Sequence, residues 1–185
     1  MIEDALLEAE DGMERAVAAT KKDFGNIRTG RANPEMFNSI LVEYYGAMTP
    51  LQQLASVQIP EARMVLVSPY DRGSVQAIIQ AIRDADLGIN PTDDGNLIRC
   101  TLPALTEERR RDYVKQARTR AEEGRISIRN ERRRAKEELE RIKKDGEAGE
   151  DEVERGEKQL EDLTKKFVAL VDGELEAKEK DLMTV

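Results

Sequence analysis

The chain has 185 residues, of which 37% are charged and only 4% are aromatic. This length suggests one or two domains, and the composition is typical of long helices in an extended bundle rather than of a compact globule built around aromatic side chains. The formal net charge of −8 argues on its own against nucleic-acid binding. Binding follows the local field, however, so the distribution of charge along the chain decides the question.

Residue types used in catalysis and metal binding are scarce. The chain has no His, which removes the commonest general base and metal ligand. It also has no Gly-rich phosphate loop and no nucleophile motif. The carboxylates recur at helical spacing and are expected to be surface charge. We therefore predict that the protein is not an enzyme and uses no metal or cofactor.

The single cysteine and the lack of long apolar runs bear on location. Cys100 lies in an apolar run, which predicts a buried small residue and is consistent with a reducing compartment. No apolar run approaches the roughly 18 residues of a membrane span. The first residues, MIEDALLEAE, are acidic and amphipathic, unlike a signal or transit peptide. These features predict a cytoplasmic protein with no membrane partner.

Residues 2–29 predict one long helix. Apolar side chains recur at intervals of three and four residues from Ile2 to Ile27. Gly30 is a natural stop just beyond the last turn, and Arg28 complements the partial negative charge of a helix C-terminus.

The pattern changes in residues 31–104, which predict a small α+β domain. All six prolines of the chain fall between Arg31 and Leu105. A turn at Pro91–Gly95 leads into the last of the expected strands. The expected elements are a helix over 73–86 and strands over 38–45, 57–59, 64–68 and 97–102.

Two further long helices are expected, one over 105–144 with Thr106 as its N-cap and one over 150–183. Together with the first helix, their apolar stripes predict an elongated, antiparallel three-helix bundle that carries the α+β domain as an insertion. The overall fold class is therefore α+β.

The predicted domains are a bundle formed by residues 1–30 and 105–185 and an insert formed by residues 31–104. The chain leaves the bundle at 30–34 and returns at 103–105. Two crossing segments of this kind can act as a hinge between rigid bodies. The expected hinge residues are Gly30, Arg31, Pro103, Ala104 and Leu105.

Basic residues are concentrated and sorted within the second long helix. Half of all Lys and Arg lie in residues 106–144. With an advance of about 100° per residue, eight of them fall on one flank and the glutamates fall mostly on the other side. We call these eight the basic flank: Arg111, Lys115, Arg118, Arg125, Arg129, Arg132, Arg133 and Lys136.

Two interpretations of the basic flank are open. It could be a solvated helix face that is laced with ion pairs between residues four apart. It could also be a cationic stripe that docks on a polyanion, and its richness in arginine suits forked contacts to phosphate.

Five stretches of the sequence resemble one family, the ribosome recycling factors, in order and over the whole chain. They are Ile27–Ala32, Val42–Gly46 together with Thr49–Ala55, Asp86–Pro91, Leu102–Arg110 and Arg129–Arg133. The resemblance implies an L-shaped molecule, similar in outline to a transfer RNA, with a three-helix bundle and a β/α/β domain. It implies a translation factor that splits the post-termination ribosome into subunits, together with elongation factor G and GTP, so that a new round of initiation can begin.

The resemblance also implies partners and contact residues. The bundle would lie on the ribosomal RNA of the large subunit, and the smaller domain would swing about the hinge and meet elongation factor G. The bundle can bury its own stripes, so a monomer is expected. The expected RNA contacts, with Arg132 first, are Arg132, Arg129, Arg133, Arg110, Arg28 and Arg31.

Some features fit other interpretations. The stem of Arg110 could be packed near the bundle core instead of binding RNA. Glu131 departs from the family's arginine motif, but its helical phase places it on the opposite side from Arg132. A dimeric helical adaptor would explain the long helices without explaining the sorted arginines or the insert. A general single-strand RNA-binding protein would need stacking aromatics that this sequence places mostly in its cores.

Overall fold

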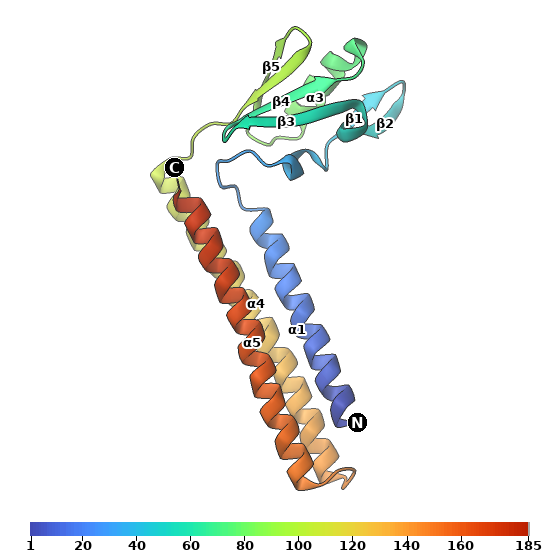
Figure 1. Cartoon of the computed structure of the whole chain (residues 1–185), viewed down its shortest axis with the longest axis vertical. Helices are drawn as coiled ribbons and strands as arrows, with labels where there is room; N and C mark the ends of the chain where they lie inside the picture. The colour runs from blue at the N-terminus through green and yellow to red at the C-terminus, as the bar shows by residue number, and fades with distance from the viewer. Residues whose placement is uncertain (185) are drawn as a thin grey trace. The chain divides into compact units, whose positions relative to one another are not determined.

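The structure is a computed structural model, and it describes residues 1–184. The chain divides into two compact units. The helical unit comprises Met1–Arg28 and the chain from Glu107 onward, and the sheet unit comprises Thr29–Thr106. The first unit consists of long helices and the second of a twisted sheet with a helix packed on it (Figure 1). The predicted α+β class, with a three-helix bundle interrupted by a small β-containing insert, is confirmed.

The helical unit is built from α1 (Ile2–Gly25), α4 (Glu107–Lys144) and α5 (Glu150–Met183). The bounds of α5 match the prediction, and α4 begins at Glu107, two residues into the predicted span and directly after Thr106, the predicted N-cap. The predicted end of α1 at residue 29 is wrong, because α1 ends at Gly25 and Asn26 caps it in the right-handed helical conformation. Gly and Asn are weak helix formers, which explains the earlier end. Gly30 therefore does not stop this helix.

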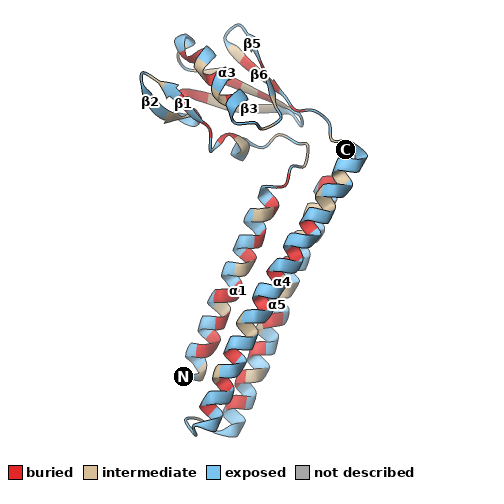
Figure 2. Ribbon diagram, turned by 180° about the vertical axis from the view of Figure 1, so that it is seen from behind, coloured by how far each residue is buried: buried red, intermediate tan, exposed pale blue. Residues whose placement is uncertain are grey.

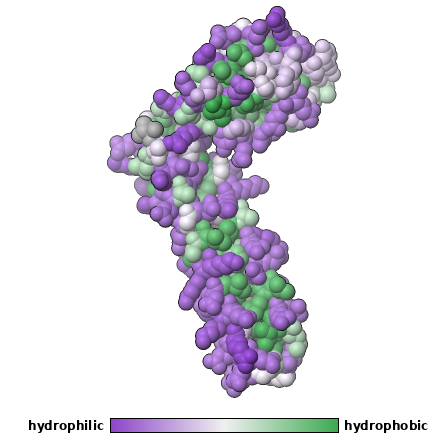
Figure 3. Space-filling view, in the orientation of Figure 1, coloured by the Kyte–Doolittle hydropathy of each residue, from purple (hydrophilic) through white to green (hydrophobic). Residues whose placement is uncertain are grey.

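The core of the helical unit is a long file of small and aliphatic side chains between the three helices. Figure 2 shows the buried residues as a stripe along each helix, with exposed residues on the outer faces. Met13 of α1, Ile128 and Leu139 of α4 and Val171 of α5 are fully buried. Hydrophilic residues cover most of the visible surface of this unit, with hydrophobic surface along its middle (Figure 3).

Glycines let the helices of this unit approach closely. A Cβ at Gly12 would lie 2.5 Å from Cδ of Glu131, and one at Gly156 would lie 2.9 Å from Cγ2 of Ile2. A Cβ at Gly124 would clash with the hydroxyl of Thr20. At these three positions, on three different helices, an added side chain would force a neighbour to move, most easily at Gly12, where the neighbour is the flexible end of Glu131.

A Schellman turn joins α4 to α5. Gly146 takes φ +69°, its N–H donates to the Lys143 carbonyl, and the N–H of Glu147 donates to the Ile142 carbonyl. Arg141 sits at the centre and donates to Glu138 (2.7 Å), Asp145 (2.9 Å) and Glu147 (3.1 Å), which raises its pKa. The turn is thus held by both backbone and ionic contacts.

The sheet unit contains a two-stranded hairpin and a four-stranded antiparallel sheet. The hairpin pairs β1 (Leu41–Tyr44) with β2 (Ala47–Pro50). The sheet has the order β3-β4-β6-β5. Its strands are β3 (Ala55–Glu61), β4 (Met64–Pro69), β5 (Asn90–Asp94) and β6 (Leu97–Thr101).

Short helices complete the sheet unit. Helix α3 (Val75–Asp84) packs Ile78 and Ile82 into the core, and a single helical turn, α2 (Leu51–Leu54), precedes β3. The 3₁₀ turns η1 (Pro34–Phe37) and η2 (Arg72–Ser74) begin behind Asn33 and Asp71, whose carboxamide and carboxylate oxygens accept backbone N–H groups. Cys100 is fully buried, and burial raises its pKa to about 11.

Two predictions about the sheet unit are wrong. The strand expected over 38–45 is shorter, since β1 begins only at Leu41, and it was not expected to pair with a second strand, β2, across a tight turn in which Tyr45 and Gly46 both take positive φ. The turn expected over Pro91–Gly95 is mostly strand β5, and the chain reverses at Gly95. Pro91 fits in β5 because this strand lies at the edge of the sheet.

Among the described residues, no helix is long and apolar enough to cross a membrane.

Candidate nucleic-acid interface

The basic flank of α4 lies along the seam with α5. Three of its arginines, seven residues apart, reach carboxylates of α5. Nε of Arg118 lies 2.6 Å from Glu179, Nη2 of Arg125 lies 2.7 Å from Asp172, and Nη1 of Arg132 lies 3.8 Å from Glu161. The helices are antiparallel, so the residue numbers of the partners on α5 decrease as those of the arginines on α4 increase.

Arg125 is the most firmly held member of the flank. Its Nε and Nη2 both contact Oδ1 of Asp172, and its Nη1 lies 3.1 Å from Glu122. Its side chain is only 20% exposed. Burial opposes its charge, but the hydrogen bonds to Asp172 and Glu122 raise the pKa of Arg125. These contacts make Arg125 a tie between two helices rather than an open phosphate ligand.

Glu122 extends this network to the outer side of α4. Its Oε1 accepts a hydrogen bond of 3.0 Å from Nη1 of Arg129. The hydrogen bonds from Arg125 and Arg129 lower the pKa of Glu122. One chain of alternating charges therefore leads from α5 to the solvent side of the flank. It is formed by Asp172, Arg125, Glu122 and Arg129.

The remaining cations of the flank are more open. Arg132 is 40% exposed, and its single ion pair with Glu161 is long for a hydrogen bond. Lys115, Arg133 and Lys136 are exposed and form no ion pair among residues 1–184. The predicted contacts Arg129, Arg132 and Arg133 thus come together within about one turn of α4, with Arg133 the least engaged.

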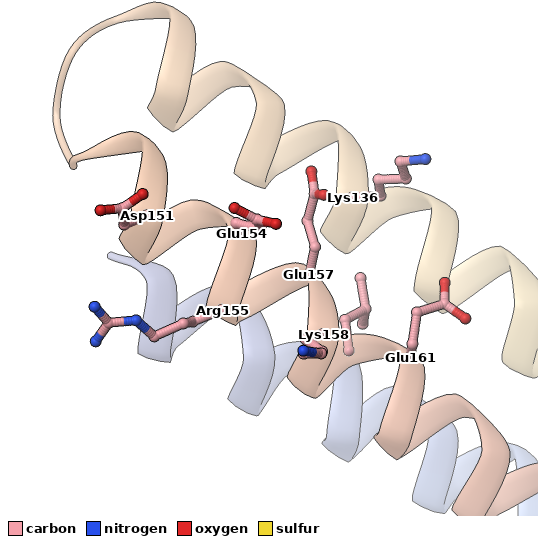
Figure 4. Close-up of a pocket in the computed structure, with 8 residues that line it drawn as sticks. Lys136, Asp151, Glu154, Arg155, Glu157, Lys158 and Glu161 are labelled. Carbon is pink, nitrogen blue, oxygen red and sulfur yellow. The ribbon is translucent and has the colours of Figure 1, made fainter.

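A shallow groove lies between α4 and α5 near the turn that joins them. Figure 4 shows Lys136 on α4 opposite residues of α5. Both signs of charge occur in it, and the described residues contain no group of His, Cys, Asp or Glu arranged to hold a metal ion. The lining residues are Lys136, Asp151, Glu154, Arg155, Glu157, Lys158, Leu160 and Glu161.

The other three predicted RNA contacts lie elsewhere in the chain. Arg110 is half-buried near the start of α4, roughly 28 Å along the helix from Arg129. Arg28 follows α1 in the helical unit, and Arg31 is exposed in the sheet unit. The structure gathers Arg129, Arg132 and Arg133 and does not gather these three with them.

Both predicted hinge segments lie within the sheet unit and are anchored there. Gly30 takes φ +77°, and a Cβ there would lie 3.0 Å from Cγ of Leu105. The N–H of Ala32 donates to the Ala62 carbonyl at 2.6 Å, and the N–H of Leu102 donates to the Arg63 carbonyl at 2.8 Å. An apolar hollow beside these bonds is lined in part by Met64, Leu102, Pro103 and Ala104.

In the helical unit, Lys178 contacts the chain just before the outgoing segment begins. Its Nζ donates to the Ile27 carbonyl at 2.9 Å. Burial lowers the pKa of Lys178. Lys178 was missed by sequence reasoning, since no local pattern links it to a residue so distant in the chain.

The carboxylates that partner the flank were also missed. The seven-residue spacing of Arg118, Arg125 and Arg132 could have indicated them, because that spacing keeps residues beside one neighbouring helix. Glu131 behaves differently. Its side chain, 22% exposed, lies over Gly12 of α1 and pairs with Arg134, on the side of α4 away from the flank.

Comparison with known proteins identifies the family. The family model described as ribosome recycling factor matches residues 20–183. The ribosome-recycling factors of Kineococcus radiotolerans and Frankia casuarinae are 63% and 59% identical to the chain, with 100% of both sequences covered in each case.

Solved structures agree with the sequence relatives. A solution structure of a ribosome recycling factor is 41% identical, with a TM-score of 0.80 over 100% of this chain and 98% of the other. A Thermus thermophilus ribosome recycling factor, placed with Escherichia coli elongation factor G on the E. coli post-termination complex, is 38% identical. Its TM-score is 0.66, with 100% of both chains covered. The chain therefore belongs to the ribosome recycling factor family.

Proposed function

We propose that this protein dissociates the post-termination ribosome into its subunits, together with elongation factor G and GTP, and so frees ribosomes for a new round of initiation. The observation that carries the proposal is identity of 56–63% over the entire length to several proteins named ribosome-recycling factor. The related T. thermophilus factor placed on a post-termination complex with elongation factor G supports the choice of partners.

In this proposal the helical unit binds ribosomal RNA of the large subunit through the basic flank. Arginine guanidinium groups form forked, charge-assisted hydrogen bonds with phosphate oxygens. Arg129, Arg132 and Arg133 supply adjacent donors on a rigid helix, and Arg28, Arg31 and Arg110 add further contacts. Such binding is led by shape and phosphate spacing and weakens steeply with salt.

The α+β domain of residues 31–104 moves relative to the bundle and meets elongation factor G. The proposed hinge for this motion is formed by Gly30, Arg31 and Pro103–Leu105. Two connecting segments restrict the motion more than one would, so force applied to the sheet unit can be passed to the helical unit. The protein performs no covalent chemistry in this scheme. It acts in the cytoplasm. It acts as a monomer, because the bundle buries its apolar stripes within one chain.

Co-sedimentation with isolated large and small subunits over a salt series tests the proposal. We expect selective binding to the large subunit that weakens steeply with salt. Arg132→Ala and Arg133→Ala should each weaken it about tenfold and reduce the salt slope by roughly 0.7–0.9, the value for one phosphate contact, without loss of helix content.

Arg134→Ala is the matched control, because it removes the same charge from the next position on the opposite side of α4, where Arg134 is 78% exposed. It should change affinity little. Binding to neither subunit at low salt would overturn the proposed function. Equal losses for Arg133→Ala and Arg134→Ala would overturn the assignment of the interface. A subunit-splitting assay with elongation factor G and GTP then measures the activity itself.

A further inference from the structure

Carboxylates are built into the surface that is proposed to bind RNA. The basic flank carries eight cations, and five carboxylates form ion pairs with five of them. The paired set leaves the flank with a net charge of about plus three instead of plus eight. A surface selected only for strong attraction to polyanions would not carry this many opposing charges beside its arginines.

The need to join the helices does not explain most of these pairs. Exposed ion pairs contribute about 0–1 kcal/mol each. Arg118 is 65% exposed, Arg129 is 47% exposed and the pair of Arg132 spans 3.8 Å, so each of these is a weak tie. Among the cations of these interhelical pairs, only Arg125 is itself well shielded from solvent, at 20% exposed; in the pair of Arg118 the more shielded partner is Glu179, at 29%.

The carboxylates act differently on different polyanions. A flexible or generic RNA can settle anywhere along the flank, so its phosphates meet the paired carboxylates of α5 and Glu122 of α4 and are repelled. A rigid RNA surface that is matched to the protein can place its phosphates directly beside Lys115 and Arg133, which are exposed and form no ion pair within residues 1–184. Opposing charge at the seam therefore weakens generic binding more than matched binding.

We propose that Glu122, Glu161 and Glu179 are specificity-determining residues that weaken the binding of generic RNA to the basic flank while largely sparing the matched site on the large subunit. This inference rests on the proposed function, because it assumes that the flank meets ribosomal RNA. Asp172 is left out of the set, since its contacts with Arg125 hold α4 to α5.

The test compares two triple variants of the full chain with equal net charge. The flank variant is Glu122→Gln, Glu161→Gln and Glu179→Gln. The control variant is Glu8→Gln, Glu14→Gln and Asp162→Asn, three exposed carboxylates on α1 and α5 that form no ion pair within the described chain. Affinity is measured for a short RNA duplex of generic sequence by fluorescence anisotropy and for the large subunit by co-sedimentation, at matched salt.

We expect the flank variant to bind the generic duplex at least about tenfold more tightly, with a salt slope steeper by roughly 2–3. Its affinity for the large subunit should rise less than about threefold, so that the ratio of the two affinities falls. The control variant should change the affinity for the duplex less than about threefold, because none of its three carboxylates forms an ion pair with a cation of the flank within residues 1–184.

Three outcomes would overturn the inference. One is an equal gain in duplex affinity for both variants, which would mean that only net charge matters. Another is no gain for the flank variant. A third is an equal gain for duplex and large subunit, which would mean that the carboxylates do not discriminate. If the triple variant loses helix content, the single variants Glu161→Gln and Asp162→Asn are compared instead, with the same outcomes. Glu161 is chosen because its ion pair with Arg132 is the longest of the flank and its loss should disturb the fold least.

The failure of this inference is distinguishable from failure of the proposed function. If Arg133→Ala weakens binding to the large subunit but the flank variant leaves the duplex affinity unchanged, the assignment of the interface is supported and the proposed specificity role of the carboxylates is refuted. If Arg133→Ala has no effect on binding to the large subunit, the assignment of the basic flank as the interface is refuted.

Discussion

The two units are held together in different ways. The helical unit packs small residues and glycines between long helices, with Ala117, Ala121 and Ala135 in its core. The sheet unit packs larger side chains, such as Phe37, Ile78 and Ile98, between a helix and a sheet. Each core is closed within its own unit, so neither needs apolar contacts from the other.

The distribution of charge separates the units further. Ion pairs line α4 and α5 of the helical unit, among them Arg118 with Glu179 and Arg141 with Glu138, and in the sheet unit Arg99 pairs with Asp94. The sheet unit instead exposes apolar side chains on its hairpin, including Tyr45 and Met48. The comparison indicates that charge is concentrated on the helical unit, whereas the sheet unit presents a less charged surface.

The largest expected effect removes core volume from the helical unit alone. Ile128→Ala should lower the free energy of unfolding by about 3 kcal/mol, because Ile128 is fully buried and the cavity cannot be filled by long, regular helices. Urea unfolding followed by circular dichroism at the helix band reports mainly on this unit. Tyrosine fluorescence reports mainly on the sheet unit, which holds Tyr44, Tyr45 and Tyr70.

Only the circular dichroism transition should shift. Ile126→Ala is the matched control, since Ile126 is 48% exposed on the same helix, and it should cost less than about 1 kcal/mol. A shift of both transitions by the same amount would show that the two units unfold together and would break the comparison.

A smaller effect tests the close packing of the helices. Gly124→Ala should destabilise the helical unit by about 1–3 kcal/mol, although alanine is the better helix former. The added methyl group would meet the buried Thr20, whose hydroxyl is already fixed by a 2.9 Å hydrogen bond to the Ala16 carbonyl.

Gly173→Ala in α5 is the control, because a Cβ there would meet nothing within 4 Å. It should stabilise the same unit by roughly 0.5–1 kcal/mol. Thermal unfolding of the two variants should therefore move in opposite directions. A stabilised Gly124→Ala variant would mean that helix spacing in this unit is not set by its glycines.

The sequence predicted the elements of the helical unit well because long helices follow a local rule. Periodic apolar residues and terminal glycines placed α5 at its observed bounds, and α4 within two residues. The end of α1 was misplaced because Ile27 continues the apolar period beyond the last helical turn. Its burial comes from contacts with distant parts of the chain, which periodicity does not distinguish from helix.

The sheet unit and the interface were less predictable, because their determinants are non-local. Strand β2 has no alternating pattern of its own, and the positive φ of Tyr45 is unusual for a bulky residue. The helical phase located the basic flank but gave no information about which neighbour it faces. That Arg118, Arg125 and Arg132 meet acids of α5 emerged only when the helices were placed side by side.

A modest local effect is expected at the exit from the helical unit. Lys178→Met should remove the hydrogen bond to the Ile27 carbonyl while keeping the aliphatic stem, at a cost of about 1 kcal/mol. Hydrogen exchange at the backbone amides of Ile27 and Arg28 should accelerate about fivefold, with little change in the sheet unit.

Lys180→Met serves as the control, because Lys180 is exposed and its side chain forms no hydrogen bond within residues 1–184. Its exchange pattern should match that of the unaltered protein. Equal exchange in all three proteins would mean that the burial of Ile27, rather than Lys178, fixes the start of the connecting segment.

The smallest expected effect is a difference in acid sensitivity between the units. Glu122, Glu138 and Glu150 have pKa values lowered by hydrogen bonds from Arg125 and Arg129, from Arg141 and from Lys143, respectively. A carboxyl whose pKa is lower in the folded state than in the unfolded chain contributes stability above the unfolded value of about 4.3. That contribution is lost as the pH falls from there through the folded pKa.

All three carboxylates belong to the helical unit, so acid should act there first. The urea midpoint seen by circular dichroism should fall between about pH 5 and pH 3. The midpoint seen by tyrosine fluorescence should fall less, because none of these three carboxylates belongs to the sheet unit. The triple variant Glu122→Gln, Glu138→Gln and Glu150→Gln should flatten the helical profile, since it removes the groups that titrate. A variant as acid-sensitive as the unaltered protein would assign the effect to overall charge repulsion. The two units would then differ in packing but not in how their surface charge supports the fold.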